Sequence, residues 1–117
     1  MAKKITIYHN PRCSKSRQTL ALLQEKGIEP EVILYLEQPP STNQLKSLIK
    51  KLGIRVIDLV RVKEQDFKDL GLSKTESSDE ELLTAMNSKP KLIERPIVEC
   101  GPQAALGRPP ENVLDLL

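Results

Sequence analysis

The sequence is poor in aromatic residues: it has no tryptophan, one phenylalanine (Phe67) and two tyrosines, Tyr8 and Tyr35. Proteins that hold single-stranded nucleic acids stack the bases on aromatic side chains, so this composition offers few platforms for such contacts. The net charge is +2 and is spread along the chain, which leaves no broad basic surface for a phosphate backbone. We therefore expect no nucleic-acid function.

Histidine, cysteine and long apolar runs are also scarce. His9 is the single histidine and the two cysteines, Cys13 and Cys100, lie far apart, so no Cys/His cluster has metal-ligand spacing. No segment is apolar for long enough to serve as a signal-peptide core or to span a membrane. We expect a cytoplasmic protein with no bound metal or cofactor. In that reducing compartment both cysteines would be free thiols.

The chain of 117 residues suffices for one domain with its own core, and we expect a single domain over 1–117. The alternating pattern of residues 4–8 (KITIY) predicts a strand, and the leucines of 14–26 predict a helix that ends at Gly27. The short apolar run 31–35 (EVILY) predicts a buried strand. Together these elements predict a β-α-β unit with parallel strands.

The middle of the chain predicts helices. Residues 41–53 carry leucine and isoleucine at helical spacing, and Ser41 with Gln44 forms a capping box at the start of that segment. The rest predicts a short continuation at 55–60, helical turns around Phe67 and Leu70, and a helix capped by Ser78 and Glu81 through Met86.

The last third is again β-like. Residues 91–99 hold two short apolar runs split by Pro96, AALG adds a third, and Pro109 and Pro110 open a final helix. The whole order predicts an α/β fold, in which a mixed sheet is flanked by helices in the thioredoxin-like arrangement. A helical insertion would occupy about 41–88.

Cys13 lies in the segment YHNPRCSKSR, at the point where the first strand gives way to the first helix. Free backbone N–H groups and the helix dipole favour an anion there, and Arg12, Lys15 and Arg17 add positive charge. These features lower a thiol's pKa and raise its reactive thiolate fraction. The alternative is an inert loop cysteine among ordinary surface charges.

Two neighbours of the thiol carry further chemistry. His9 adds positive charge when it is protonated, although a lone histidine is more often structural. Ser16 makes the motif Cys-x-x-Ser, so its hydroxyl is able to donate to the thiolate but not to form a disulfide with it.

Three distant arginines, Arg61, Arg95 and Arg108, complete the candidate site. Arginine stays charged and grips oxyanions with two parallel hydrogen bonds, so three of them around a thiolate would suit a small divalent anion. The alternative is that each is a solvated surface charge. Spacing in the sequence does not bring the three together.

These motifs, taken in order, resemble the glutaredoxin-dependent arsenate reductase family. The resemblance extends over essentially the whole chain: ITIYHNPRCSKSRQTL around the thiol, YLEQPPS, LVR, DLGL, ERPIV and GRPPENVLDLL. It implies that Cys13 attacks arsenate and forms a thiol-arsenate adduct, which glutathione and a glutaredoxin then resolve to arsenite. The same resemblance implies that the three arginines hold the oxyanion, that His9 and Ser16 assist the thiolate, and that Pro96 is a cis-proline.

Cys100 has two interpretations. One is a resolving cysteine of an internal thiol cascade. The other, which we favour, is a small apolar residue near a strand end. If Pro96 begins a strand beside the site, Cys100 lies roughly 13 Å along it, beyond the roughly 4.4–6.8 Å that a disulfide allows between Cα atoms.

Three other functions compete. A glutathione-linked thiol oxidoreductase of the same fold fits Cys-x-x-Ser but has no need of three arginines. An Spx-type regulator that binds RNA polymerase commonly senses oxidants through Cys-x-x-Cys, which Ser16 interrupts. A low-molecular-weight phosphatase requires Cys-x5-Arg, and position 19 is threonine. No repeat or coiled-coil pattern is present, so we expect a monomer whose partners are arsenate, glutathione and glutaredoxin.

Overall fold

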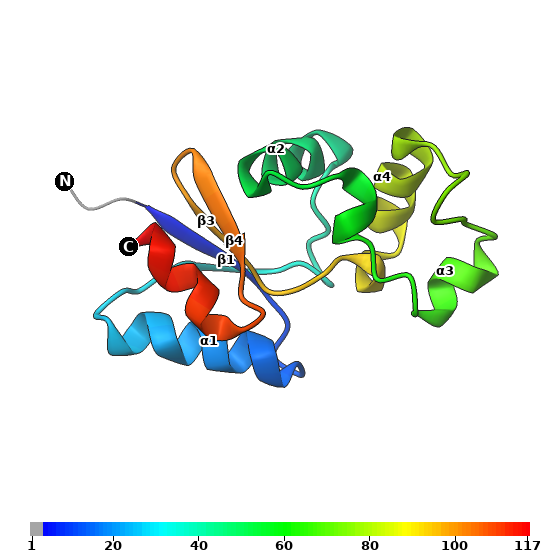
Figure 1. Cartoon of the computed structure of the whole chain (residues 1–117). Helices are drawn as coiled ribbons and strands as arrows, with labels where there is room; N and C mark the ends of the chain where they lie inside the picture. Colours follow the sequence, from blue (N-terminus) through cyan, green and yellow to red (C-terminus); the bar gives the residue numbers. More distant parts are fainter. Residues whose placement is uncertain (1–3) are drawn as a thin grey trace. The chain divides into compact units, whose positions relative to one another are not determined.

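A computed structural model describes residues 4–117, in which a run of helices separates the first two strands from the last two (Figure 1). The chain divides into two units, which are described separately. The first contains the described residues up to Gln38 together with Arg95–Leu117, and the second is Pro39–Glu94.

The first unit is built on a four-stranded mixed sheet with the strand order β2-β1-β3-β4. Strands β1 and β2 are parallel, and the β1–β3 and β3–β4 pairs are antiparallel. The elements are β1 (Ile5–His9), α1 (Ser14–Glu25), β2 (Glu31–Leu34), β3 (Ile97–Cys100), β4 (Gln103–Leu106) and the 3-10 helix η3 (Pro110–Leu116). This confirms the predicted β-α-β and β-β-α parts of an α/β fold with a mixed sheet.

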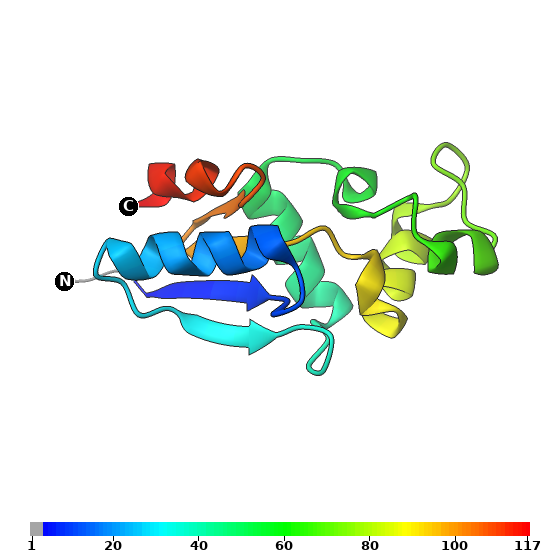
Figure 2. The same cartoon turned by 90° about the horizontal axis from the view of Figure 1, so that it is seen from below.

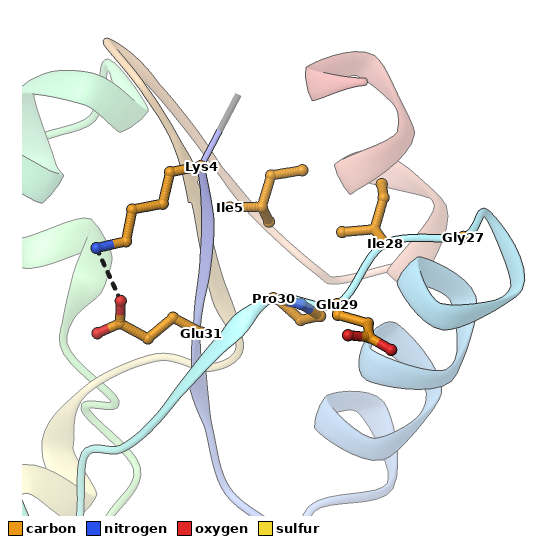
Figure 3. A pocket seen from close by; sticks show the side chains of 7 residues that line it. All are labelled: Lys4, Ile5, Gly27, Ile28, Glu29, Pro30 and Glu31. Atoms are coloured by element: carbon orange, nitrogen blue, oxygen red, sulfur yellow. Dashed lines mark ion pairs between the residues drawn. The ribbon is translucent and has the colours of Figure 1, made fainter. Parts of the chain in front are cut away.

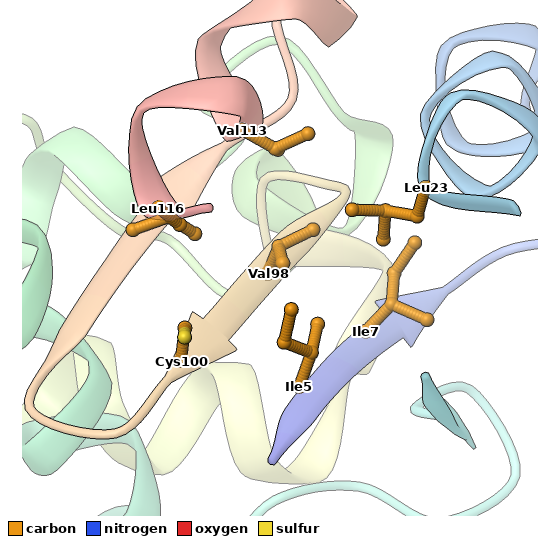
Figure 4. Close-up of a cluster of buried hydrophobic side chains, with 7 residues drawn as sticks. All are labelled: Ile5, Ile7, Leu23, Val98, Cys100, Val113 and Leu116. Carbon is orange, nitrogen blue, oxygen red and sulfur yellow. The ribbon is translucent and has the colours of Figure 1, made fainter. Parts of the chain in front are cut away.

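Helix α1 and helix η3 lie on one face of the sheet and contact each other (Figure 2). Their apolar side chains meet those of β1 and β3 in a buried cluster (Figure 4). The cluster consists of Ile5, Ile7, Leu23, Val98, Cys100, Val113 and Leu116. Burying each large side chain of such a core stabilises the fold by about 1.5–3 kcal/mol, so this layer fixes α1 against the sheet.

The second unit is helical. It contains α2 (Thr42–Leu52), the 3-10 helix η1 (Val56–Leu59), α3 (Gln65–Asp69), α4 (Asp79–Ser88) and the 3-10 helix η2 (Pro90–Leu92). The predicted capping boxes begin α2 and α4, where Ser41 and Ser78 each accept the backbone N–H three residues on. Gly53 ends α2 with φ +69°, a left-handed conformation that glycine adopts without a Cβ penalty.

Two predictions about strands were wrong. Strand β2 was expected to be buried, but it is an edge strand whose Val32 is 43% exposed. The apolar run before Pro96 was expected to be β-like. Its first part is η2, and only Ile93 forms an isolated bridge, with Val60. Pro90 accounts for this difference, because proline at the start of a turn favours helical dihedral angles.

No helix between residues 4 and 117 has both the length and the apolar character that crossing a bilayer requires.

Candidate active site

Cys13 caps the N-terminus of α1, as the sequence predicts. A turn over Asn10–Arg12 leads to it: the side-chain Oδ1 of Asn10 accepts the Arg12 N–H, and the Asn10 carbonyl accepts the Cys13 N–H, each at 3.0 Å. The thiol is partly exposed, so it is accessible to a small molecule. The backbone N–H groups of Lys15 and Ser16, in the first turn of the helix, act on its sulfur. N–H groups in that turn have no helical partner.

The surroundings of Cys13 lower its pKa. Partial burial is the largest single influence and raises the pKa, but it is outweighed by the Ser16 N–H, the Arg95 guanidinium and the Lys15 N–H. The two N–H groups do not form a cap of full hydrogen-bond geometry. Their dipoles nevertheless favour the charged sulfur. This supports the interpretation of Cys13 as a reactive thiolate over that of an inert loop cysteine.

The cation that acts on the thiolate is Arg95, from far along the chain, and not a neighbour in sequence. Arg17 was expected to supply positive charge to the thiol. Its Nη1 instead donates to the Pro11 carbonyl at 2.9 Å, where it braces the turn before Cys13. Tertiary structure thus replaces the predicted local cations with a single distant one.

His9 and Ser16, both buried, form a hydrogen-bond network with the partly buried Asn10 in the turn that leads to Cys13. The Ser16 hydroxyl, which is fully buried, lies 2.6 Å from His9 Nδ1 and accepts the Asn10 N–H at 3.0 Å. Burial lowers the pKa of His9, and the charge of Arg17 lowers it further. In a neutral His9 ring, the tautomer decides whether Nδ1 accepts the Ser16 proton or donates its own proton to the Ser16 oxygen.

This network changes the expected roles of two residues. His9 was expected to add positive charge near the thiol, but the lowered pKa keeps its ring neutral at neutral pH. The Ser16 hydroxyl was expected to donate to the thiolate. It bonds to His9 and Asn10, and Ser16 acts on the sulfur through its backbone N–H. Both side chains therefore hold the turn in place beside Cys13.

Arg95 and Arg108 lie close together. Arg108 Nη1 lies 3.4 Å from the Arg95 carbonyl oxygen, to which it donates. Both residues precede cis peptide bonds, Arg95–Pro96 and Arg108–Pro109, so the prediction of a cis-proline at Pro96 is confirmed. Two of the three predicted arginines thus share one region of the first unit, and Arg95 also reaches Cys13.

Arg61 belongs to the second unit, and its hydrogen bonds and ion pair are with residues of that unit. Its Nη1 forms an ion pair with Glu64 Oε1 at 2.6 Å and donates to the Lys91 carbonyl at 3.4 Å. Its backbone N–H donates to the Leu92 carbonyl at 2.7 Å. The predicted role of Arg61 toward an oxyanion stays a prediction.

Cys100 is a buried core residue. It is 1% exposed, its thiol is free, and it pairs with Ile5 at the start of β1. Cys13 follows the opposite end of that strand, past His9, and four residues of strand span roughly 13 Å. The placement agrees with the small apolar role that we favour and leaves no route to a disulfide without unfolding the sheet.

A cavity of about 470 Å³ lies at the far end of α1, away from the thiol (Figure 3). It is lined by Lys4 and Ile5 at the start of β1 and by residues 27–31, which lead into β2, and Lys4 forms an ion pair with Glu31 across it. The helix between Cys13 and Gly27 is roughly 18 Å long. This cavity is therefore separate from the candidate site. Within residues 4–117, no three His, Cys, Asp or Glu side chains gather closely enough to hold a metal ion.

Comparisons with known proteins point to one family. The ArsC family model matches residues 8–116. An arsenate reductase of Haemophilus influenzae is 51% identical over 114 residues, covering 97% of this chain and 98% of that protein. An uncharacterized Escherichia coli protein, YfgD, is 52% identical over 100% of this chain and 99% of its own. The solved structure of an arsenate reductase from Vibrio cholerae superimposes with a TM-score of 0.96 at 53% identity, with both chains covered completely.

Proposed function

The chain belongs to the ArsC family, and we propose on this basis that it reduces arsenate to arsenite at Cys13. The observation that carries the proposal is the placement of Arg95, which lowers the pKa of the partly exposed thiol and whose carbonyl oxygen accepts a hydrogen bond from Arg108. A thiolate beside two arginines provides a nucleophile and an oxyanion site in one place.

In the first step the thiolate of Cys13 attacks arsenic. A sulfur–arsenic bond forms, an oxygen of arsenate leaves as water after it takes up a proton, and arsenic stays pentavalent. Arg95 and Arg108 favour this step because guanidinium groups hold the tetrahedral oxyanion and its developing charge in a fixed position. We propose that Arg61 assists them, which rests on the resemblance in sequence alone.

The next steps need thiols from outside the chain. Glutathione condenses with the adduct, and a glutaredoxin thiolate then attacks the glutathione sulfur. The sulfur–arsenic bond to glutathione breaks with its electron pair passing to arsenic, which becomes trivalent, while the two thiols form a mixed disulfide. Hydrolysis releases arsenite and regenerates Cys13.

Two features of the chain support external donors. A two-electron reduction that returns Cys13 to its thiolate requires two further thiol equivalents. Cys100 is buried in the core at the other end of β1, and Ser16 stands where a Cys-x-x-Cys motif would have its second thiol. Glutathione is abundant in the cytoplasm, the compartment that we predict for this chain.

The test is arsenite formation from arsenate with glutathione and glutaredoxin, for the wild type and Cys13→Ser in parallel. We expect turnover that disappears with the thiol. The matched control is Cys100→Ser, which should keep its turnover. Wild-type turnover that is absent under conditions in which a known reductase works would overturn the proposal. Turnover with a glutathione mixed disulfide instead would favour the thiol oxidoreductase.

A further inference from the structure

A tight joint connects the start of α1 to the two segments that carry Arg95 and Arg108. Thr19, which is fully buried, lies one helical turn after Lys15 and donates its hydroxyl to the Lys15 carbonyl at 2.8 Å. The same oxygen lies 3.4 Å from the Gly107 carbonyl oxygen, so the hydroxyl proton is shared between the helix and the segment before Arg108.

Gly107 continues the joint toward the other arginine. Its N–H donates to the Pro96 carbonyl at 2.9 Å, and Pro96 directly follows Arg95. Hydrogen bonds thus run from Lys15 through Thr19 and Gly107 to Pro96. Each arginine is the immediate neighbour of a bonded residue.

The joint is also sterically closed. A Cβ added at Gly107 would overlap Thr19 Oγ1, and it would lie 2.8 Å from Pro96 Cγ and 3.0 Å from Thr19 Cγ2. Optimal contacts between carbon atoms are about 3.5–4.0 Å, so only a residue without a side chain permits this approach. The φ of Gly107 lies outside the left-handed range, unlike that of Gly101 at +59°. The requirement for glycine at 107 is therefore one of space and not of backbone conformation.

We propose that Thr19 and Gly107 are positioning residues that set the distance between the Cys13 thiolate and the Arg95–Arg108 pair. The proposal rests on the proposed function only for arsenate as the substrate. The effect of the joint on the distance between Arg95 and the thiolate does not depend on whether arsenate is reduced. Arg95 reaches the Cys13 sulfur only if its segment stays against α1, and the joint holds that segment to α1 through Gly107 and Thr19.

Neither residue was predicted from the sequence. Gly107 stands beside Arg108 in GRPPE, and that adjacency was the only signal available for it. The sequence distinguishes Thr19 only as the position where a phosphatase loop would require arginine.

The experiment uses the full chain with three variants: Thr19→Val, which removes the hydroxyl at constant size, Thr19→Ser, which keeps it, and Gly107→Ala. The two readouts are the KM for arsenate beside kcat, and the pH profile of Cys13 alkylation by iodoacetamide. Small displacements of positioned groups cost large factors in rate. We expect Thr19→Val to raise KM roughly tenfold and to move the alkylation profile to higher pH. Thr19→Ser should restore both toward the wild type, and Gly107→Ala should act in the same direction as Thr19→Val.

Two controls separate positioning from loss of stability. Gly101→Ala, at the turn of the same β3–β4 hairpin, strains a left-handed residue but meets no atom within 4 Å. Thr84→Val removes a hydroxyl from an exposed position of α4. Both should keep the wild-type alkylation profile.

Several results would overturn the proposal. One is a folded Thr19→Val protein with wild-type KM and alkylation profile, and another is a Thr19→Ser protein as impaired as Thr19→Val. A folded Gly107→Ala protein that behaves like Gly101→Ala would equally refute the steric role. If Gly107→Ala does not fold, the comparison of Thr19→Val with Thr19→Ser tests the proposal by itself. If the wild type does not reduce arsenate, the proposed function fails, and the alkylation profiles still decide whether the joint positions Arg95.

Discussion

Ser16→Ala is the sharpest test of the hydrogen-bond network in the turn that leads to Cys13. The substitution removes a fully buried hydroxyl that bonds to His9 Nδ1 and to the Asn10 N–H. It leaves the buried His9 ring and the partly buried Asn10 N–H without the bond. An unsatisfied buried polar group costs about 1–3 kcal/mol. We expect the free energy of unfolding to fall by about 2–4 kcal/mol, because part of the cost is relieved by local relaxation. For a chain of this length the melting temperature should drop by roughly 8–16 °C.

Urea denaturation of Ser16→Ala and of the matched control Ser41→Ala measures this difference. Ser41 also accepts a backbone N–H, but in the exposed capping box of α2, and losing such a cap costs about 1 kcal/mol. A Ser16→Ala protein no less stable than Ser41→Ala would refute the reasoning. Alkylation adds a second test: the Ser16 backbone N–H survives the substitution, so the pH profile of Cys13 should stay close to that of the wild type. A large shift would mean that the hydroxyl acts on the thiolate directly.

Three other predictions concern the site and the core. Arg95→Leu removes the guanidinium that lowers the pKa of Cys13, so alkylation at pH 7 should slow, whereas Arg12→Leu should leave its rate nearly unchanged. Because the folded-state pKa of His9 lies below its ordinary 6.5, the unfolded chain binds the extra proton first, and stability measured by urea should fall as pH drops below 6.5. His9→Gln should flatten that dependence. Cys100→Ser should keep arsenate turnover yet lose about 1–3 kcal/mol of stability, since it buries a hydroxyl among apolar groups.

The pKa of Cys13 shows how the site balances opposing influences. Burial disfavours the thiolate, and N–H groups together with one guanidinium favour it. A more deeply buried sulfur would lose more hydration, which would raise the pKa of Cys13. A fully exposed sulfur would be screened by solvent from the N–H groups and the guanidinium, which would weaken their lowering of the pKa. The partly exposed position at the start of α1 combines accessibility to arsenate with a stabilised charge.

Local interactions explain what could be predicted from the sequence. The capping boxes of α2 and α4, the left-handed Gly53 after α2, and the place of Cys13 before α1 all depend on residues within a few positions of one another. Such contacts form wherever the chain adopts that conformation, so composition and spacing suffice to predict them. The order of strands and helices followed for the same reason.

The wrong predictions concerned features that no local pattern determines. An apolar run such as that of β2 is compatible with a central or an edge strand. Strand β2 pairs with β1 on one side and with no strand on the other, and this edge position leaves it exposed. Of the cations near Cys13 in sequence, Arg17 was overestimated because its side chain extends to the Pro11 carbonyl. The hydrogen bond between Ser16 and His9 likewise depends on the tertiary structure, which brings the end of β1 beside the first turn of α1.

The sequence by itself determined that a thiol would sit at the start of a helix, followed by a serine and without a second cysteine nearby. Only the tertiary structure decided which charge stabilises that thiol and which residues hold the charge in place. Arg95, Gly107 and Thr19 are far apart along the chain and meet because the β3–β4 hairpin packs beside β1 and returns to α1. Electrostatic and steric effects depend on distance in space, and residues that are far apart along the chain come close to one another only in the folded structure.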